Sequence, residues 1–439
     1  MNPYVIKEVK ARQVYDSRSV PTVEVDILLE CGVLGRGIVP SGASTGKFEA
    51  LELRDHDPHK LNGKSVYKAI DHIEKVIAPA IIGMDATNQV AIDHTLIKLD
   101  GTENKSRLGA NSILAVSIAV AWAGANANKL PLYRYLGGAN AKVLPVPMIQ
   151  IIGGGAHAVG TTDFQDYLII PVGSKSFTEG YEMVVNVYHA TKKVFLKYEK
   201  PLATADEGGF WPTNFKTNEE GLQLVLEGIK EAGYVPGKDI AIALDIASSE
   251  FYQEDGTYFL SLENRKLNRT EFVNYLAELV EKYPIISIED AMAETDWEGS
   301  KLATEKLGSS VQLIGDDLFT TNINRIKKGV ELGINNSVLI KMNQIGTITE
   351  TLDAIEYTKN AGYLPVISAR SGETEDMTIV HLAIATNAGQ LKVGSVARSE
   401  RTVKWNEVIR IEEELNESGI YAGGEIFERI LNTNENHLV

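Results

Sequence analysis

The sequence predicts an α/β fold in which a small N-terminal α+β domain, residues 1–135, precedes a larger domain, residues 136–439. Two observations predict this arrangement. Strand-like alternation at the start gives way to helical patterns before residue 135, which is the order of an α+β domain. After residue 144, short runs that are apolar on both faces alternate with amphipathic helices, which is typical of a parallel sheet covered on both sides.

The first 40 residues predict a β-hairpin or a meander. Apolar and polar residues alternate over Thr22–Ile27 and again over Val33–Val39, as expected for half-buried strands. The next segment, PSGASTGK (40–47), is rich in glycine and small hydroxyl side chains. Such a segment does not hold a regular element, so we expect a mobile loop.

Two helical patterns complete the smaller domain. Apolar residues recur at helical spacing over 66–76, and residues 108–127 are rich in alanine and largely apolar. Ser117 interrupts the second pattern, which stays short of the roughly 18 apolar residues that cross a membrane. We expect a buried helix there and no membrane anchor.

The larger domain begins its alternation of strands and helices near Val146. Five clear strand candidates are Ile240–Leu244, Ile285–Ile288, Val311–Ile314, Ser337–Ile340 and Leu364–Ile367. Helices with apolar residues at helical spacing separate them. Roughly eight or nine candidate strands lie between Val146 and Val396, which is enough to close a barrel. Periodicity does not distinguish a barrel from an open doubly wound sheet.

Composition is that of an ordinary folded protein and limits the partners. Of the 439 residues, 44% are hydrophobic and 23% are charged. The formal net charge of −16 disfavours nucleic acid and anionic membranes, so an anionic ligand needs local cations or a metal ion. The single cysteine, Cys31, excludes an intrachain disulfide and fits the reducing cytoplasm.

Charged side chains follow nearly every predicted strand of the larger domain. Because the carboxyl ends of parallel strands meet at one edge of a sheet, we expect these side chains to share one site. Charges placed at random would fall equally often at strand starts. The residues are Asp245, Glu289, Asp290, Asp316, Asp317, Lys341, Lys392 and, after the apolar run Leu202–Ala205, Glu207.

Three of these acids, Asp245, Glu289 and Asp316, form an oxygen-only set without histidine or cysteine. Hard oxygen ligands suit Mg²⁺ or Mn²⁺ rather than zinc. Carboxylates packed together without a cation raise one another's pKa, so a divalent ion is the simplest explanation. Salt bridges to Lys341 and Lys392 are the alternative.

The strand ends also offer a base and an acid. A lysine near cations and shielded from water loses its proton near neutral pH, so Lys341 or Lys392 is a candidate base. Glu207, in a glycine-flanked loop, is the complementary acid. His157 lies in another glycine-rich loop, where a structural role and a site role are both open. A metal, a base and an acid together describe proton abstraction next to a carboxylate and departure of a β-hydroxyl.

Residues 364–376, LPVISARSGETED, carry the candidate anion site. A short apolar run breaks abruptly into a polar loop. Arg370 supplies a planar, charged donor fork and Ser371 a hydroxyl, which suit a phosphate or a carboxylate. The alternative is an arginine in a solvated loop that pairs with Glu373 or Glu375.

From end to end the chain resembles the enolase (phosphopyruvate hydratase) family. The matching strings include PTVEVD, VPSGASTG, EALELRD, DGTENKSRLGANSIL, DEGGF, SIED, IKMNQIGT, SGETED and ARSER. The resemblance implies a modified (β/α)8 TIM-type barrel after the small domain, usually in a homodimer. It also implies two Mg²⁺ ions per active site and conversion of 2-phosphoglycerate, a small phospho-carboxylate anion, to phosphoenolpyruvate in glycolysis.

The resemblance further implies roles for individual residues. Lys341 would be the base and Glu207 the acid, with Asp166 as the partner of the acid. Lys392 would meet the substrate carboxylate. The other implied residues are Asp245, Glu289 and Asp316 on the first Mg²⁺, Ser44 on the second, Arg370 and Ser371 on the phosphate, and His157 and Gln165 in closing the site.

Several positions depart from the family pattern, and they cluster around the expected site. Ala369 stands where the family has a histidine, and Asp166 stands where it has a glutamate. Gly153 takes the place of an asparagine, and Phe48 lies in the loop where a histidine is common. Ala369, Gly153 and Phe48 are therefore candidate specificity residues.

Four functions remain open at this point. An ordinary enolase keeps the machinery, whereas a divergent dehydratase acts on a larger analogue, because Ala369, Asp166 and Gly153 each remove bulk. Carboxyphosphonoenolpyruvate synthase, an enolase homologue of phosphonate biosynthesis with a phosphono-carboxylate substrate, fits the second description. The intact metal and base positions argue against a pseudoenzyme with a binding role, and the two lysines argue against phosphoryl hydrolysis. We expect a cytoplasmic homodimer or a larger assembly.

Overall fold

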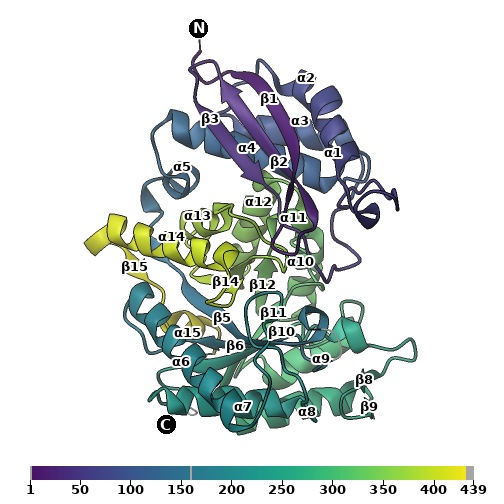
Figure 1. Cartoon of the computed structure of the whole chain (residues 1–439), viewed down its shortest axis with the longest axis vertical. Coiled ribbons are helices and arrows are strands. Elements are labelled where there is room, and N and C mark those ends of the chain that lie inside the picture. Colours follow the sequence, from purple (N-terminus) through teal and green to yellow (C-terminus); the bar gives the residue numbers. More distant parts are fainter. Residues whose placement is uncertain (1, 159–160, 432–439) are drawn as a thin grey trace.

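The computed structural model describes residues 2–158 and 161–431 (Figure 1). A three-stranded antiparallel sheet comes first, with β2 (Pro21–Leu29) between β1 (Ile6–Tyr15) and β3 (Leu34–Ile38). This is a meander, one of the two predicted arrangements. The helices that follow are α1 (Tyr67–His72), α2 (Ala78–Ile81), α3 (Gln89–Asp100), α4 (Ala110–Ala127) and α5 (Leu132–Gly137).

Helix α4 packs along the sheet and forms the core of this part of the molecule. Val23 and Val25 of β2 are fully buried. A Cβ atom at Gly37 of β3 would lie 2.7 Å from the carbonyl oxygen of Ala115, so the helix backbone lies directly on the strand. Helix α4 is long and apolar enough to cross a membrane, but 83% of it is buried within the described structure. The predicted buried helix is confirmed.

Eight strands close a barrel in the order β10-β11-β12-β13-β14-β5-β6-β7, which excludes the open sheet. Figure 1 shows the barrel below the N-terminal sheet. The strands are β5 (Val146–Gly153), β6 (Asp166–Ile170), β7 (Ala241–Asp245), β10 (Ile285–Glu289), β11 (Gln312–Gly315), β12 (Ser337–Ile340), β13 (Leu364–Ser368) and β14 (Gln390–Gly394).

The barrel is modified at β6, which pairs antiparallel with both β5 and β7. The wholly parallel sheet expected from the apolar runs is therefore wrong at this strand. A parallel neighbour needs a crossover, usually a helix, between the two strands. Among the described residues between β5 and β6, only a 3₁₀ turn at Gly155–His157 is present. Helices α6 (Phe177–Lys197) and α7 (Glu219–Glu231) instead follow β6.

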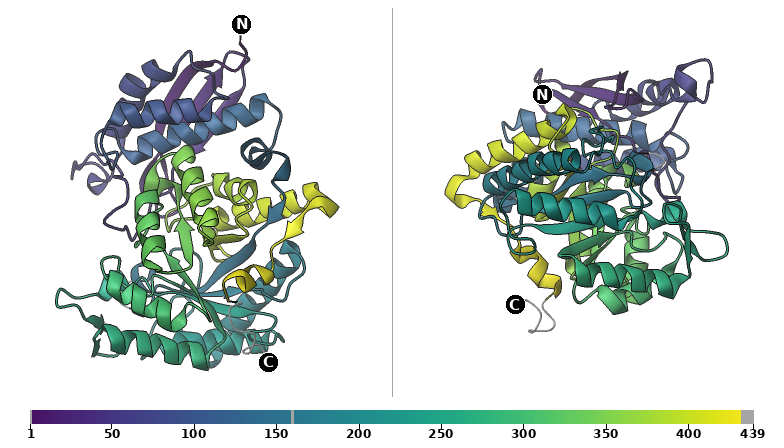
Figure 2. Two further views of the ribbon diagram at one scale, coloured as in Figure 1. Left: turned by 180° about the vertical axis from the view of Figure 1, so that it is seen from behind. Right: turned by 60° about the horizontal axis from the view of Figure 1, so that its bottom comes forward.

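Helices enclose the barrel from outside, as the two views of Figure 2 show. They bury the outer face of each strand, which is why the strands are apolar on both faces. Besides α6 and α7, these helices are α8 (Arg269–Lys282), α9 (Trp297–Leu307), α10 (Ile323–Leu332), α12 (Ile348–Asn360), α13 (Thr378–Ala385) and α14 (Ser399–Leu415). Two short helices differ: α11 (Met342–Ile345) follows β12 and contacts α4, and α15 (Glu425–Leu431) packs Ile426 and Phe427 into a second apolar cluster of strand residues.

Short paired strands lie outside the barrel. One predicted strand, Leu202–Ala205, is wrong, because Thr204 makes only an isolated bridge with Phe210. Glu207 therefore lies in the loop between α6 and α7. The short strands are β4 (Val143–Leu144) with β15 (Ile420–Tyr421), and β8 (Tyr258–Leu260) with β9 (Arg265–Leu267).

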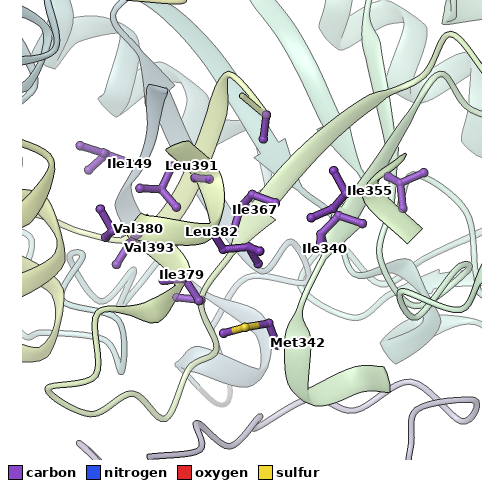
Figure 3. Packing of buried hydrophobic residues seen from close by; sticks show 14 of the residues in the cluster. Ile149, Ile340, Met342, Ile355, Ile367, Ile379, Val380, Leu382, Leu391 and Val393 are labelled. Atoms are coloured by element: carbon purple, nitrogen blue, oxygen red, sulfur yellow. The ribbon is translucent and has the colours of Figure 1, made fainter. Parts of the chain in front are cut away.

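The barrel core fixes the ends of the strands. Figure 3 shows Ile340, Ile367 and Leu391, from three neighbouring strands, in one apolar cluster with Ile355 and Leu382 from the helices. All five side chains are at most 2% exposed. Dense packing of this kind gives each strand one register, so the residue that follows it has a fixed position at the barrel mouth.

Candidate active site

Asp245, Lys341 and Lys392, which lie on or directly after three different barrel strands, line one pocket at the carboxyl ends of the strands. The other strand-end acids, which are not part of its lining, are Glu289, Asp290, Asp316 and Asp317. The pocket includes most of the predicted site residues. The residues that line it are Ser44, His157, Gln165, Glu207, Asp245, Lys341, Ser368, Ala369, Arg370, Ser371, Lys392, Val393 and Gly394.

Lys392, on β14, bridges carboxylates from other strands. Its Nζ donates to Asp245 Oδ2 at 2.8 Å and to Glu289 Oε2 at 2.6 Å, and it lies 3.8 Å from Asp166 Oδ2. Burial lowers the pKa of Lys392, but Asp245 and Glu289 outweigh burial and raise this pKa well above its ordinary value. Lys392 is therefore a fixed cation.

Lys341 follows β12 and pairs with Asp316. The other oxygen of Asp316 accepts a hydrogen bond from Gln344 Nε2 at 2.7 Å. Burial lowers the pKa of Lys341, but Asp316 outweighs burial and raises it. The nearest charged neighbours of both lysines in this arrangement are carboxylates rather than the cations that the sequence-based prediction assumed.

The carboxylates of Asp245, Glu289 and Asp316 have the chemistry of an oxygen-only metal site. Glu289 Oε1 is buried and has no hydrogen-bond partner in the part of the chain that the structure describes. Burial and the neighbouring Asp245 raise the pKa of Glu289 well above its ordinary value. A divalent cation with hard oxygen ligands would satisfy this oxygen and offset the repulsion. These residues therefore fit a magnesium ion, although the alternative salt bridges to both lysines are also present.

A second acidic group lies beside the first. Carboxylate oxygens of Asp290, Asp316 and Asp317 are within 4.8 Å of one another. Burial, followed by the charge of Asp316, raises the pKa of Asp290 to about 8. Burial and Asp290 raise the pKa of Asp317 to about 9. The predicted set of Asp245, Glu289 and Asp316 does not meet this spacing among the described residues. The sequence placed all of these acids at strand ends.

His157 connects two buried acids. Its Nδ1 lies 2.9 Å from Asp166 Oδ1, and its Nε2 lies 3.8 Å from Glu207 Oε1. Burial lowers the pKa of His157, but the two carboxylates outweigh burial and raise it to about 9. Burial alone raises the pKa of Glu207, yet His157 and other cations lower it overall. His157 is therefore a charged member of the pocket, so of its two open roles the structure favours the site role.

Gln150 supports the group formed by His157, Asp166 and Glu207. This residue was not identified from the sequence. Its Nε2 donates to Asp166 Oδ1 at 2.6 Å, and its Oε1 accepts from the backbone N–H of Gly209 at 2.9 Å. Gln150 is fully buried in β5. A single amide inside the apolar run VPMIQIIG is the signal that could have identified it, because a buried amide needs partners.

Arg370 follows β13 and is 3% exposed. Its Nη1 donates to Glu49 Oε2 at 2.9 Å, and its Nη2 donates to Glu49 Oε1 at 3.1 Å. Glu373 accepts from Arg370 only through the backbone N–H, at 3.0 Å, and pairs with Lys404 Nζ at 2.9 Å. The alternative of a solvated arginine paired with Glu373 or Glu375 is therefore wrong, since the partner comes from the N-terminal loop.

The segment after Arg370 is held on both sides. Ser371 Oγ accepts from the N–H of Ala43 at 2.6 Å and from Arg18 Nη1 at 3.3 Å. Arg401, fully buried in α14, donates from Nη1 to the carbonyl oxygens of Arg370, at 2.7 Å, and Val393, at 2.9 Å. Sequence reasoning missed Arg401, which reads as an ordinary helix-surface charge.

The positions that depart from the family pattern lie in different places. Ala369 lines the pocket and is 6% exposed. Gly153 packs away from the lining, since a Cβ there would lie 2.8 Å from Ala205 Cβ. Phe48 is 44% exposed and lies outside the lining, with the Cζ of Arg325 3.7 Å from its ring centroid.

Comparison with known proteins gives one consistent result. The family model for "Enolase, N-terminal domain" matches residues 6–136, and the model for "Enolase, C-terminal TIM barrel domain" matches residues 141–430. Enolase 1 of Desulfitobacterium hafniense (strain Y51) is 64% identical over 428 residues, which are 97% of this chain and 98% of that protein.

Proposed function

This chain belongs to the enolase family of hydro-lyases, and we propose that it converts 2-phosphoglycerate to phosphoenolpyruvate in glycolysis. The observation that supports this most is one pocket lined by Lys341, the buried Glu207 and the buried Arg370. Removal of water from a phosphorylated hydroxy acid needs a base, an acid and an anion site together.

In this proposal the substrate carboxylate meets Lys392, and its phosphate meets Arg370 and Ser371. Lys341 Nζ takes the proton from the carbon next to the carboxylate. Glu207 gives a proton to the β-hydroxyl, which leaves as water while the electron pair of the broken C–H bond forms the double bond. The balance is one proton gained by the lysine, one lost by the glutamate and one molecule of water released.

His157, Asp166 and Gln165 support these steps. The charged imidazole of His157, 3.8 Å from Glu207, would return a proton to that carboxylate, and Asp166 holds the other ring nitrogen. Gln165 Nε2 donates to Asp245 Oδ2 at 3.1 Å. A glutamate with a lowered pKa needs such a proton source to act as an acid.

Asp245, Glu289 and Asp316 would hold the first Mg²⁺, and Ser44 would meet the second. Bound there, the ions would supply positive charge that stabilises the doubly charged enolate of the substrate. Carboxylates engaged in this way stabilise the ammonium of Lys341 less, so the pKa of Lys341 would fall toward the range of a base.

A larger analogue with an extra group on phosphorus is the second candidate substrate. The position of Ala369 in the pocket wall favours it, because a methyl group there leaves room that an imidazole would fill. Lys341 and Glu207, as base and acid, would remove water from this analogue in the same way.

One assay separates these functions. Purified protein is mixed with Mg²⁺ and 2-phosphoglycerate, and the absorbance of the enolpyruvate product is followed. A kcat within about tenfold of the 1–1000 s⁻¹ of typical enzymes supports the ordinary enolase reaction. Turnover of the phosphono analogue alone supports the second candidate. If neither compound turns over and Lys341→Ala does not change the background, a binding role stands instead.

We further propose that the enzyme works as a homodimer in the cytoplasm. The family resemblance supports the dimer, and a single cysteine in 439 residues fits a reducing compartment. Light scattering during size-exclusion chromatography tests the assembly, since a dimer has twice the chain mass of 48.0 kDa.

A further inference from the structure

Glu49 has no part in the proposed reaction, although it lies against the anion site. It belongs to the 42–49 loop, which is part of the segment between β3 and α1. Both of its carboxylate oxygens accept hydrogen bonds from Arg370, at 2.9 and 3.1 Å. The side chains of Glu49 and Arg370 are 9% and 3% exposed, so this bidentate pair is shielded from water.

The other η hydrogens of Arg370 are engaged as well. Nη1 donates to Asn343 Oδ1 at 3.0 Å, and Nη2 donates to the carbonyl oxygen of Ser44 at 2.9 Å. A guanidinium has five N–H groups. Within the described residues the Nε–H alone has no partner, and Arg370 lines the pocket. An anion in the pocket therefore meets a guanidinium whose η edge is already fixed.

Glu49 also holds the loop and reaches toward the candidate metal ligands. Its Oε1 accepts from the N–H of Gly46 at 3.0 Å and from Gln344 Nε2 at 3.4 Å. The same Gln344 nitrogen donates to Asp316 at 2.7 Å. A Cβ at Gly42 would overlap Arg370 Nη2, so the loop backbone lies directly against the guanidinium. One carboxylate thus contacts the loop, the anion site and a neighbour of Asp316.

We propose that Glu49 is a positioning residue that orients Arg370 toward the substrate phosphate and makes this orientation depend on the seated 42–49 loop. This inference rests on the proposed function and deepens it. A guanidinium that is already fixed loses little conformational freedom when it binds an anion. A carboxylate beside a phosphate site also repels phosphate, so competition for Arg370 is the opposing explanation, and it predicts the opposite sign.

The test compares Glu49→Ala and Glu49→Gln with Lys47→Ala. Lys47 is the matched control, because it is in the same loop but pairs with Glu294 at 3.7 Å and its side chain is 73% exposed. The measurements are KM and kcat for 2-phosphoglycerate, and the Kd of inorganic phosphate by calorimetry with Mg²⁺ present. Circular dichroism melting verifies that each variant is folded.

For Glu49→Ala we expect KM and the phosphate Kd to rise at least about tenfold, the size of a lost charge-assisted pair. We expect kcat to change less than about threefold, because ground-state binding is affected. Glu49→Gln should show an intermediate loss, since its amide oxygen still accepts one N–H. Lys47→Ala should stay within about twofold of the wild type.

Tighter phosphate binding by either Glu49 variant would overturn the proposal and show that Glu49 competes with phosphate for Arg370. Unchanged binding would also overturn it, because the Glu49–Arg370 ion pair would then serve only the stability of the fold. The phosphate Kd decides even if the wild type does not turn over 2-phosphoglycerate. If the wild type binds no phosphate, amide hydrogen exchange of residues 42–49 decides. Glu49→Ala and Arg370→Ala should then increase the exchange rate of these amides equally, and Lys47→Ala should leave it unchanged. Any other pattern contradicts the proposal.

Discussion

Ala369 shows how one side chain in the pocket wall bears on substrate choice. We expect Ala369→His to lower KM for 2-phosphoglycerate severalfold with kcat nearly unchanged, because an imidazole N–H adds a donor beside Arg370. Ala369→Phe is the control, since it adds similar bulk without a donor and should raise KM. The kinetics of both variants are measured in the enolpyruvate assay. A KM that rises equally in both variants would mean that size alone matters at this position.

The two lysines of the pocket have different proposed roles and should give different kinetics when removed. Lys341→Met removes the base, so we expect kcat to fall by about 10² to 10⁴, the usual contribution of general-base catalysis. KM should change little. Lys392→Met removes a binding cation and should mainly raise KM. Steady-state kinetics of both variants check this split, and equal effects on kcat would argue against it.

At the residue scale, strand-end chemistry predicted much of the pocket but not its long-range partners. Asp245, Lys341 and Arg370 each follow an apolar run, so their positions could be read from the sequence. Glu49 could not be read this way, because 321 residues separate it from Arg370. The raised pKa of Lys341 was also out of reach, since it depends on which charge lies nearest in space.

At the element scale, the N-terminal sheet carries an ion network that links stability to pH. Arg36 and Arg12 donate to Asp26 on β2. Burial raises the pKa of Asp26, but hydrogen bonds from the two arginines outweigh burial and lower it below its ordinary 3.8. A carboxyl with a lowered folded pKa contributes stability above its unfolded pKa, and this stability is lost as pH falls toward the folded pKa.

We therefore expect Asp26→Asn to lower Tm at pH 7 by about 1–3 °C, and the difference from wild type to shrink as pH falls below about 4. Differential scanning calorimetry of both proteins between pH 7 and about pH 3 measures this difference in Tm. Asp71→Asn is the control, because the Asp71–Lys75 pair is exposed and should contribute little. A difference that grows on acidification would contradict the assigned cause.

Element types were predicted more readily than strand direction. The run DYLII of β6 has the same apolar composition as its parallel neighbours, yet it runs antiparallel to both. Direction follows from the connection, and the glycine-rich segment before β6 holds no recognisable crossover helix. The run Leu202–Ala205 resembles a strand by composition, but it has only an isolated bridge through Thr204.

At the scale of the whole molecule, the pocket is assembled from both parts of the chain. Ser41 and Gly372 exchange two backbone hydrogen bonds of 2.9 Å, which fix the N-terminal loop to the end of β13. The chain carries a net charge of −16, yet Lys341, Arg370 and Lys392 lie in one pocket. This local cluster of cations gives an acidic protein a binding site for anions.

The same pocket should connect metal binding to global stability. Binding to the folded state alone stabilises a protein by about 2.7 kcal/mol at a ligand concentration 100-fold above Kd, so we expect Mg²⁺ to raise Tm and a chelator to reverse the rise. Glu289→Gln is the decisive variant. An amide keeps the size of this buried side chain but removes the negative charge that a divalent ion needs. The Mg²⁺-dependent rise in Tm should therefore be lost, and a variant that keeps the full rise would place the ion elsewhere.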